Sequence, residues 1–184
     1  MQTSTDDDYF CICKIRKVKT PSRGTPKSAG LDFFIPEDLS LEEMSELNKG
    51  INSGAEFACE ELKNRNTVTS ISLSPGKSVL IPAGVKAKVP NGYSLIFFNK
   101  SGVGSRKKLD VLASVVDQDY QGEVHLNVVN NGFETQVLTA GQKLVQGLLI
   151  PVFYAEVKEY KTPDEMYSGS SSQRGEGGFG STGK

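Results

Sequence analysis

An aspartate at the end of an apolar run is the first feature of this sequence that could do chemistry. In the segment VLASVVDQDYQGEVHLNVV, residues 111–129, Asp117 follows directly on two valines. A carboxylate held at the end of a buried strand could act as a general base toward a water molecule. Tyr120 could pack on a sugar, and the apolar runs on both sides of DQDYQG predict a hairpin. The alternative is a plain Asp-rich turn.

The single histidine, His125, lies in the second of these apolar runs. Together with Asp117 and a serine it would suggest a hydrolase triad. The sequence contains no nucleophile elbow, however, so we interpret His125 as a strand residue.

A glycine-containing basic segment could receive phosphate. It reads FFNKSGVGSRKKL, residues 97–109, and it joins two strand-like stretches. Lys100, Ser101 and Gly102 stand at its start, and a basic run follows. The alternative is an ordinary loop with a solvated basic face.

The C-terminal segment SSQRGEGGFGSTGK, residues 171–184, combines glycines with a cation and an aromatic ring. Glycines allow backbone N–H groups to approach a ligand closely, and successive N–H groups form anion-binding concavities. Arg174 adds a permanent bidentate cation, and Phe179 could stack on a flat ring. By composition alone the segment is a disordered linker, so both interpretations stay open.

Two polar side chains interrupt apolar stretches. Asp32 lies in SAGLDFF, and Gln146 lies in GQKLVQGLLIPV. A buried carboxylate without a partner is costly, so Asp32 needs a cation or a metal-bound water beside it. Each residue could also be a satisfied polar residue of the core.

The elements that position these residues are expected to be strands. Residues 67–160 contain short apolar stretches separated by Pro-Gly, Ala-Gly and Asn-Gly pairs, which predicts an antiparallel sandwich or barrel. Residues 37–66 differ, because Ser40 with Glu43 and Ser53 with Glu56 each form a capping-box pattern. We therefore predict a helical insertion of two short helices there.

Three regions follow from this pattern. Residues 1–8 are polar and predicted to be disordered, residues 9–160 form the domain with its insertion, and residues 161–184 form a flexible arm. The chain of 184 residues has a net charge of −1, so we expect no nucleic acid or anionic membrane as a partner. The acidic N-terminus and the absence of a long apolar run predict a soluble, cytoplasmic protein with reduced cysteines.

Five segments taken together carry a resemblance that none carries alone. They are AGLDFF, NKSG, VVDQDYQG, GQKLVQ and RGEGGFGSTG, in this order. The set resembles the five motifs of the trimeric dUTPase family. The resemblance implies an all-β, jelly-roll-like barrel that assembles as a homotrimer, with active sites shared between chains. It further implies hydrolysis of dUTP to dUMP and pyrophosphate, with Mg²⁺ on the triphosphate, for nucleotide-pool sanitation and dUMP supply.

The resemblance also implies a role for each matching residue. Asp117 matches the base that activates the attacking water, and Tyr120 matches the ring beneath the deoxyribose. The hairpin is expected to read uracil through main-chain groups near Ser114 and His125. The other matching residues are Lys100, Ser101, Gly102 and Gln146 for phosphate, Asp32 for the metal-bound waters, Arg174 for the γ-phosphate, Phe179 for stacking on uracil, and Gly180, Ser181 and Thr182 for closing on the phosphates.

Departures from the family pattern leave other functions open. Lys100 and Lys143 stand where arginine is usual, Ser114 replaces a usual glycine, and Gly147 interrupts the fourth motif. One alternative is a dCTP deaminase or deaminase–pyrophosphatase on the same barrel. Another is a nucleotide-sensing or protein-binding module, with residues 37–66 either as a partner-binding element or as an inert surface elaboration.

Overall fold

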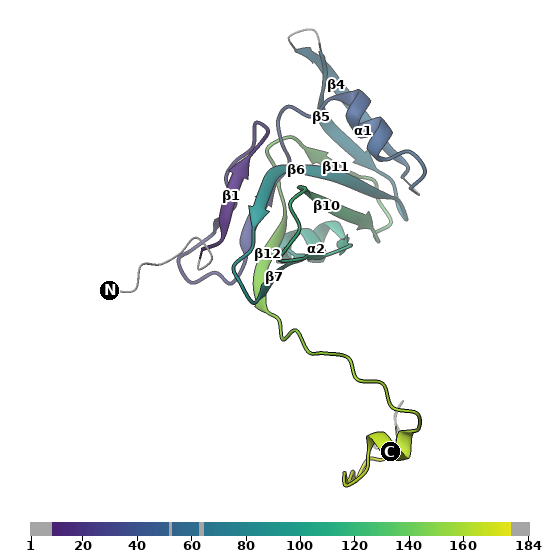
Figure 1. Cartoon of the computed structure of the whole chain (residues 1–184). Helices are drawn as coiled ribbons and strands as arrows, with labels where there is room; N and C mark the ends of the chain where they lie inside the picture. The colour runs from purple at the N-terminus through teal and green to yellow at the C-terminus, as the bar shows by residue number, and fades with distance from the viewer. Residues whose placement is uncertain (1–8, 52, 63–64, 178–184) are drawn as a thin grey trace, which may run out of the picture. The chain divides into compact units, whose positions relative to one another are not determined.

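The computed structural model describes residues 9–51, 53–62 and 65–177. The chain divides into two compact units, the first ending at Phe153 and the second beginning at Tyr154. Strands dominate the first unit (Figure 1), which confirms the predicted all-β class. The segment 1–8, predicted to be disordered, lies outside the described residues.

The strands of the described ranges form three antiparallel sheets. Their orders are β1-β6-β10-β8, β2-β3-β12-β7-β9 and β11-β5-β4. In chain order the strands are β1 (Cys11–Lys14), β2 (Ser22–Arg23), β3 (Leu31–Phe34), β4 (Ala55–Leu62), β5 (Arg65–Leu73), β6 (Ser78–Lys88), β7 (Tyr93–Asn99), β8 (Leu109–Leu112), β9 (Val115–Val116), β10 (Glu123–Asn130), β11 (Gln136–Thr139) and β12 (Lys143–Pro151).

Strand β10 shows how the sequence pattern fills the core. Its side chains alternate strictly, with Val124, Leu126 and Val128 each 1% exposed. Successive side chains of a strand point to opposite faces, so the odd-numbered residues, including His125 and Asn127, face away from that core. The first unit therefore has one buried apolar layer, to which all three sheets contribute side chains.

The first predicted helix of the insertion is confirmed as α1 (Leu41–Leu47). The backbone N–H of Glu43 donates to Oγ of Ser40 at 3.2 Å, which is half of the capping box that the sequence predicted. Met44 on this helix and Leu39 before it are fully buried. The insertion is thus part of the core as well as of the surface.

The second predicted helix, over residues 53–66, is wrong, because this segment contains β4. Strand β4 pairs antiparallel with β5 from Ala55 to Leu62, with one bulge. Phe57 and Cys59 are half-buried, whereas Glu56 and Glu60 are exposed, so the segment follows a period of two. Helical spacing of a few apolar residues was outweighed by the hydrogen bonds that the long neighbouring strand offers.

The second unit contains the short helix α3 (Pro163–Met166), which begins with a capping bond from the N–H of Glu165 to Oγ1 of Thr162. Its described residues are almost all exposed. Across the described part of the chain, no helix combines the length and the apolar character needed to span a bilayer.

Candidate active site

Between β8 and β9 the chain passes from one sheet to another, and a cavity opens there. Strand β8 pairs with β10 only as far as the partners Leu112 and Asn127. The chain then turns at Ala113, whose φ of 45° is left-handed, and joins β7 through β9. The segment 111–129 is therefore a hairpin whose arms separate before the turn, so the first part of β10 is not paired with β8.

The cavity beside this opening has a volume of about 170 Å³. Pockets for drug-sized ligands usually measure about 300–1,000 Å³, so this one suits a single small ring. Most of its wall is apolar. The polar side chains that line it are Asp117, Tyr120, His125 and Asn127, and the apolar ones are Leu80, Ala113, Val115, Val116 and Val124.

The polar residues of this loop are held by bonds to the main chain. The carbonyl of Glu123 accepts both the hydroxyl of Tyr120 and Nδ1–H of His125, each at 2.9 Å. The backbone N–H of Tyr120 donates to the carbonyl of Asp117 at 3.2 Å. The loop that carries the exposed carboxylate of Asp117 is therefore held by hydrogen bonds to the carbonyls of Asp117 and Glu123.

One main-chain group of Ser114 is already hydrogen-bonded within the fold. Its carbonyl accepts the N–H of Phe97 at 2.8 Å, and the cavity is lined by the residues on either side of it. His125 lies beyond the last β10 residue that pairs with β8, so its main chain borders the opening. Of the two main-chain positions expected to read uracil, His125 is the better placed.

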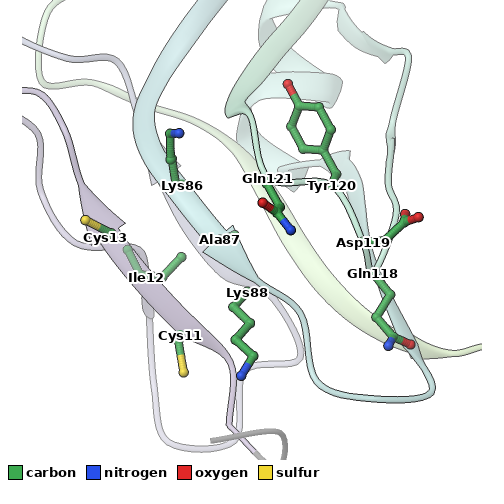
Figure 2. A pocket seen from close by; sticks show the side chains of 10 residues that line it. All are labelled: Cys11, Ile12, Cys13, Lys86, Ala87, Lys88, Gln118, Asp119, Tyr120 and Gln121. Carbon is green, nitrogen blue, oxygen red and sulfur yellow. The ribbon is translucent and has the colours of Figure 1, made fainter.

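A second, larger cavity of about 560 Å³ lies on the other side of Tyr120. Figure 2 shows its walls, formed by β1, the end of β6 and the loop residues 118–121. Lys86 and Lys88 line it from β6, and Asp119 lines it from the loop. Asp119 and Asp117 thus border different cavities although only one residue separates them.

The carboxylate of Asp32 is the centre of a cationic cluster. Asp32 lies on β3 and is 5% exposed. Its Oδ1 accepts a hydrogen bond from Nζ of Lys100, and its Oδ2 lies 2.9 Å from Nζ of Lys143. One negative and two positive groups leave an excess of positive charge, which suits an anion such as phosphate.

Burial by itself would raise the pKa of Asp32, because a charged carboxylate is less stable away from water. The hydrogen bonds and the attraction of Lys100 and Lys143 outweigh this effect and hold the pKa of Asp32 below its usual 3.8. Asp32 therefore stays ionised at neutral pH and keeps both lysines in place.

Gln146 belongs to the same cluster. It lies on β12 opposite Asp32, and its Nε2 donates to the carbonyl of Asn99 at 2.9 Å. Gly30, from the motif AGLDFF, makes this possible, because a Cβ there would lie 2.6 Å from Oε1 of Gln146. Lys100 directly precedes the short helix α2 (Ser101–Lys107) and makes no side-chain capping bond to it; the first residues of this helix, Ser101 and Gly102, are exposed.

The loop that carries Asp117 and the cluster around Asp32 lie at opposite ends of β7. Val116 pairs with Leu95, so Asp117 is level with the start of that strand. Gln146 pairs near its other end, and Lys100 directly follows it. The six residue-to-residue steps from 94 to 100 span about 20 Å at ~3.3 Å per step. Asp117 therefore does not reach a phosphate bound at Lys100 of the same chain.

No group of three or more His, Cys, Asp or Glu side chains suited to a metal ion occurs among the described residues. Asp32, expected to hold metal-bound waters, uses both carboxylate oxygens on lysines. Mg²⁺ commonly binds through one or two carboxylates together with substrate phosphates. These residues therefore fit a metal that arrives on a phosphate chain better than one held by the protein alone.

The C-terminal residues that the sequence predicted for the site belong to the second unit. Arg174 is exposed, and its Nε donates to the carbonyl of Gly177 at 2.6 Å, within a turn. Phe179, Gly180, Ser181 and Thr182 lie outside the described residues.

Sequence reasoning missed Asn127. The signal was present in EVHLNVVN, where a period of two places His125 and Asn127 on the same face of one strand. The cavity that this face lines depends on the path of residues 113–117, which no local pattern predicts.

Comparison with known proteins identifies the family of this chain. The sequence model of the dUTPase family matches residues 66–183, which is more than half of the chain. The chain belongs to the dUTPase family. Among its relatives, the deoxyuridine 5'-triphosphate nucleotidohydrolase of Paraburkholderia phymatum is 35% identical over 117 residues, covering 62% of this chain and 75% of the relative. That of Chlamydia trachomatis serovar L2 is 33% identical over 146 residues, covering 78% and 95%.

Solved structures show that the dUTPase fold extends over nearly the whole chain. A mutant dUTPase of Staphylococcus bacteriophage 80alpha with dUpNHpp has a TM-score of 0.67 and 20% identity, covering 96% of this chain and 99% of that one. A dUTPase mutant from phage phi11 of S. aureus, described with a structural Mg(II) ion, has a TM-score of 0.62 and 18% identity, covering 85% and 99%. At these identities the likeness concerns the fold alone.

Proposed function

We propose that this protein hydrolyses dUTP to dUMP and pyrophosphate, with uracil in the small cavity and Asp117 as the general base. The observation that carries the proposal is the position of the Asp117 carboxylate on the wall of a cavity sized for one ring. A base in this cavity would place its sugar toward Tyr120 and its α-phosphate toward Asp117. Membership of the dUTPase family supports this choice of substrate.

The mechanism asks two things of this chain's residues. Asp117 takes a proton from the water that attacks the α-phosphorus, and the cluster of Lys100, Lys143 and Gln146 holds the phosphates in line. Phosphoryl transfer depends mainly on such positioning and on stabilisation of charge. Mg²⁺ carried on the triphosphate would neutralise phosphate oxygens. Arg174 and the residues after it are proposed to close over the nucleotide.

The distance of about 20 Å between the two ends of β7 bears on assembly. A nucleotide whose base lies beside Asp117 of one chain needs phosphate ligands from another. We therefore propose a homotrimer in which each site combines the Asp117 loop of one chain with the Asp32 cluster of a second.

The test is pyrophosphate release from a panel of nucleoside triphosphates, with and without Mg²⁺. We expect dUTP to be the preferred substrate. Replacement Asp117→Asn should lower kcat by about 10²–10⁴, which is the usual contribution of a general base. The control is Asp119→Asn, which borders the other cavity and should stay within a few-fold of wild type.

Two outcomes would contradict the proposal. Ammonia release from dCTP, with no pyrophosphate from dUTP, would indicate a deaminase. Full turnover by the Asp117→Asn variant would remove Asp117 from the chemistry.

A further inference from the structure

The side chain of Glu123, the first residue of β10, is bound at both carboxylate oxygens. Its Oε1 accepts Nε–H of Arg16 at 2.7 Å and the backbone N–H of Gly84 at 2.9 Å. Its Oε2 accepts Nη2–H of Arg16 at 2.8 Å, and the Glu123 side chain is only 14% exposed. A bidentate pair of arginine and carboxylate fixes orientation as well as distance. The place of Glu123 is therefore set by the segment after β1 and by β6.

The main chain of Glu123 in turn holds the ring of Tyr120. The hydroxyl of Tyr120 donates to the carbonyl of Glu123 at 2.9 Å. Tyr120 lines both cavities and is 43% exposed, and exposed side chains change rotamer readily when nothing holds them. The pairing of β10 with β6 is irregular between Glu123 and His125, so regular strand pairing does not fix this carbonyl. The bonds to the Glu123 carboxylate supply what the irregular pairing lacks.

The guanidinium that holds Glu123 also binds the insertion. Nη1 of Arg16 donates to Oε2 of Glu43 at 2.9 Å, and Nη2 donates to Oε1 of the same residue. Arg16 thus uses its planar group to orient two carboxylates at once, whereas the ammonium of a lysine is a single point charge. A continuous set of bonds therefore leads from Glu43 on α1 through Arg16 and Glu123 to the Tyr120 ring.

We propose that Arg16 is a positioning residue that keeps Tyr120 beside the sugar of the nucleotide by holding Glu123 in place. This inference rests on the proposed function, and it goes beyond it by naming the residues that decide how firmly deoxyribose is preferred to ribose. A ring face held against the sugar offers no hydrogen-bond partner to the additional hydroxyl of a ribonucleotide, which disfavours UTP. Helix α1 takes part in this selection, because Glu43 orients Arg16.

The experiment measures kcat/KM for dUTP and for UTP with the full-length protein. Arg16→Lys keeps the positive charge but loses the planar group that spans both carboxylates. We expect the ratio of kcat/KM for dUTP to that for UTP to fall about three- to tenfold, the value of one ordinary hydrogen bond, with kcat for dUTP changed less than about threefold. The control Lys17→Gln removes the neighbouring cation, which pairs with Glu37, and should leave the ratio unchanged.

A double-mutant cycle tests whether Arg16 acts through the tyrosine hydroxyl. Tyr120→Phe keeps the ring and removes only the group that donates to Glu123, so it should lower the same ratio by a similar factor. The variant that carries both changes should fall no further than either single variant, because both remove the same constraint. Additive effects, or an unchanged ratio in either single variant, would overturn the inference.

A milder change covers the case in which Arg16→Lys does not fold. Glu43→Ala removes the second carboxylate from Arg16 and leaves the bonds to Glu123, so the ratio should fall about two- to threefold. A lower Tm with an unchanged ratio would show that these bonds only stabilise the fold, and the inference would be wrong. If instead the wild-type protein does not hydrolyse dUTP, the proposed function itself has failed.

Discussion

Asp32 shows how one buried acid can organise a cationic site. Its two carboxylate oxygens are each engaged by a different lysine, Lys100 from the start of α2 and Lys143 from β12. A lysine side chain is a flexible point charge, unlike the rigid fork of arginine. Where the dUTPase motifs usually have arginine, this chain has lysines that Asp32 keeps in position. We therefore regard Asp32 as a positioning residue for phosphate binding.

The depressed pKa of Asp32 predicts a specific sensitivity to acid. A group whose pKa is lower in the folded state contributes stability that is full above its unfolded pKa, 3.8 for Asp32, and is lost as pH falls through the folded pKa. We expect the Asp32→Asn variant to have a lower Tm than wild type at neutral pH. Its Tm should also decrease less steeply than that of wild type below about pH 4.

The measurement is Tm against pH by circular dichroism. Asp119→Asn serves as a control, because this exposed residue lies outside the cluster and should follow the wild-type curve. Parallel curves for Asp32→Asn and wild type would show that the lysine pair does not stabilise the fold.

At the scale of elements, helix α1 is tied to the strands that form the candidate base site. Asn48, which caps the helix, is 6% exposed and bonds the main chain of Leu80 twice, at 2.9 and 3.0 Å. Glu43 on the same helix binds the guanidinium of Arg16, which also donates to Glu123 of β10 at 2.7 and 2.8 Å. These bonds connect the insertion to Leu80 and to the start of β10.

We predict that Asn48→Ala destabilises the protein by about 2 kcal/mol, because it leaves the N–H and C=O of Leu80 without their side-chain partner. Since Leu80 lines the small cavity, the KM for dUTP should also rise. Urea unfolding and steady-state kinetics measure the two effects. Asn66→Ala, on an exposed position of β5, should change neither value. Wild-type stability for Asn48→Ala would mean that α1 is not fixed to β6 by this residue.

At the scale of the whole molecule, the separation between the Asp117 loop and the Asp32 cluster leads to a quantitative prediction about assembly. A chain with Asp117→Asn and a chain with Lys100→Gln should each be nearly inactive alone. In a trimer that contains both kinds of chain, about a third of the sites would combine an intact Asp117 loop with an intact Asp32 cluster from another chain. We therefore expect mixed trimers to regain about a third of wild-type activity.

The mixed trimers can be prepared by co-expression with two different tags and sequential purification. The control co-expresses Asp117→Asn with itself under both tags and should stay inactive. If each site were built from a single chain, every site in the mixture would carry one defect and no activity would return. That result would contradict the shared site.

Local sequence rules succeeded where neighbours along the chain decide the structure. The capping pattern at Ser40 predicted the start of α1, and the apolar run around His125 predicted the strand β10. They failed for residues 53–66, where pairing with β5 decides the outcome. Gly147, an unexplained departure in sequence, has a tertiary reason. A Cβ there would lie 2.7 Å from Leu95 and 2.9 Å from Phe33, which packs edge-on against Phe97.

The sequence by itself determined the residue types of the candidate site, the order of its motifs and the all-β character of the chain. Only the tertiary structure decided that Lys100 and Lys143 share one carboxylate, that Asp117 and Lys100 stand at opposite ends of β7, and that Asn127 lines a cavity. The physical reason is that hydrogen bonds, burial and charge pairing here join residues far apart in the chain. Periodicity and capping reach only a few residues, so they place side chains on a face but not opposite a partner.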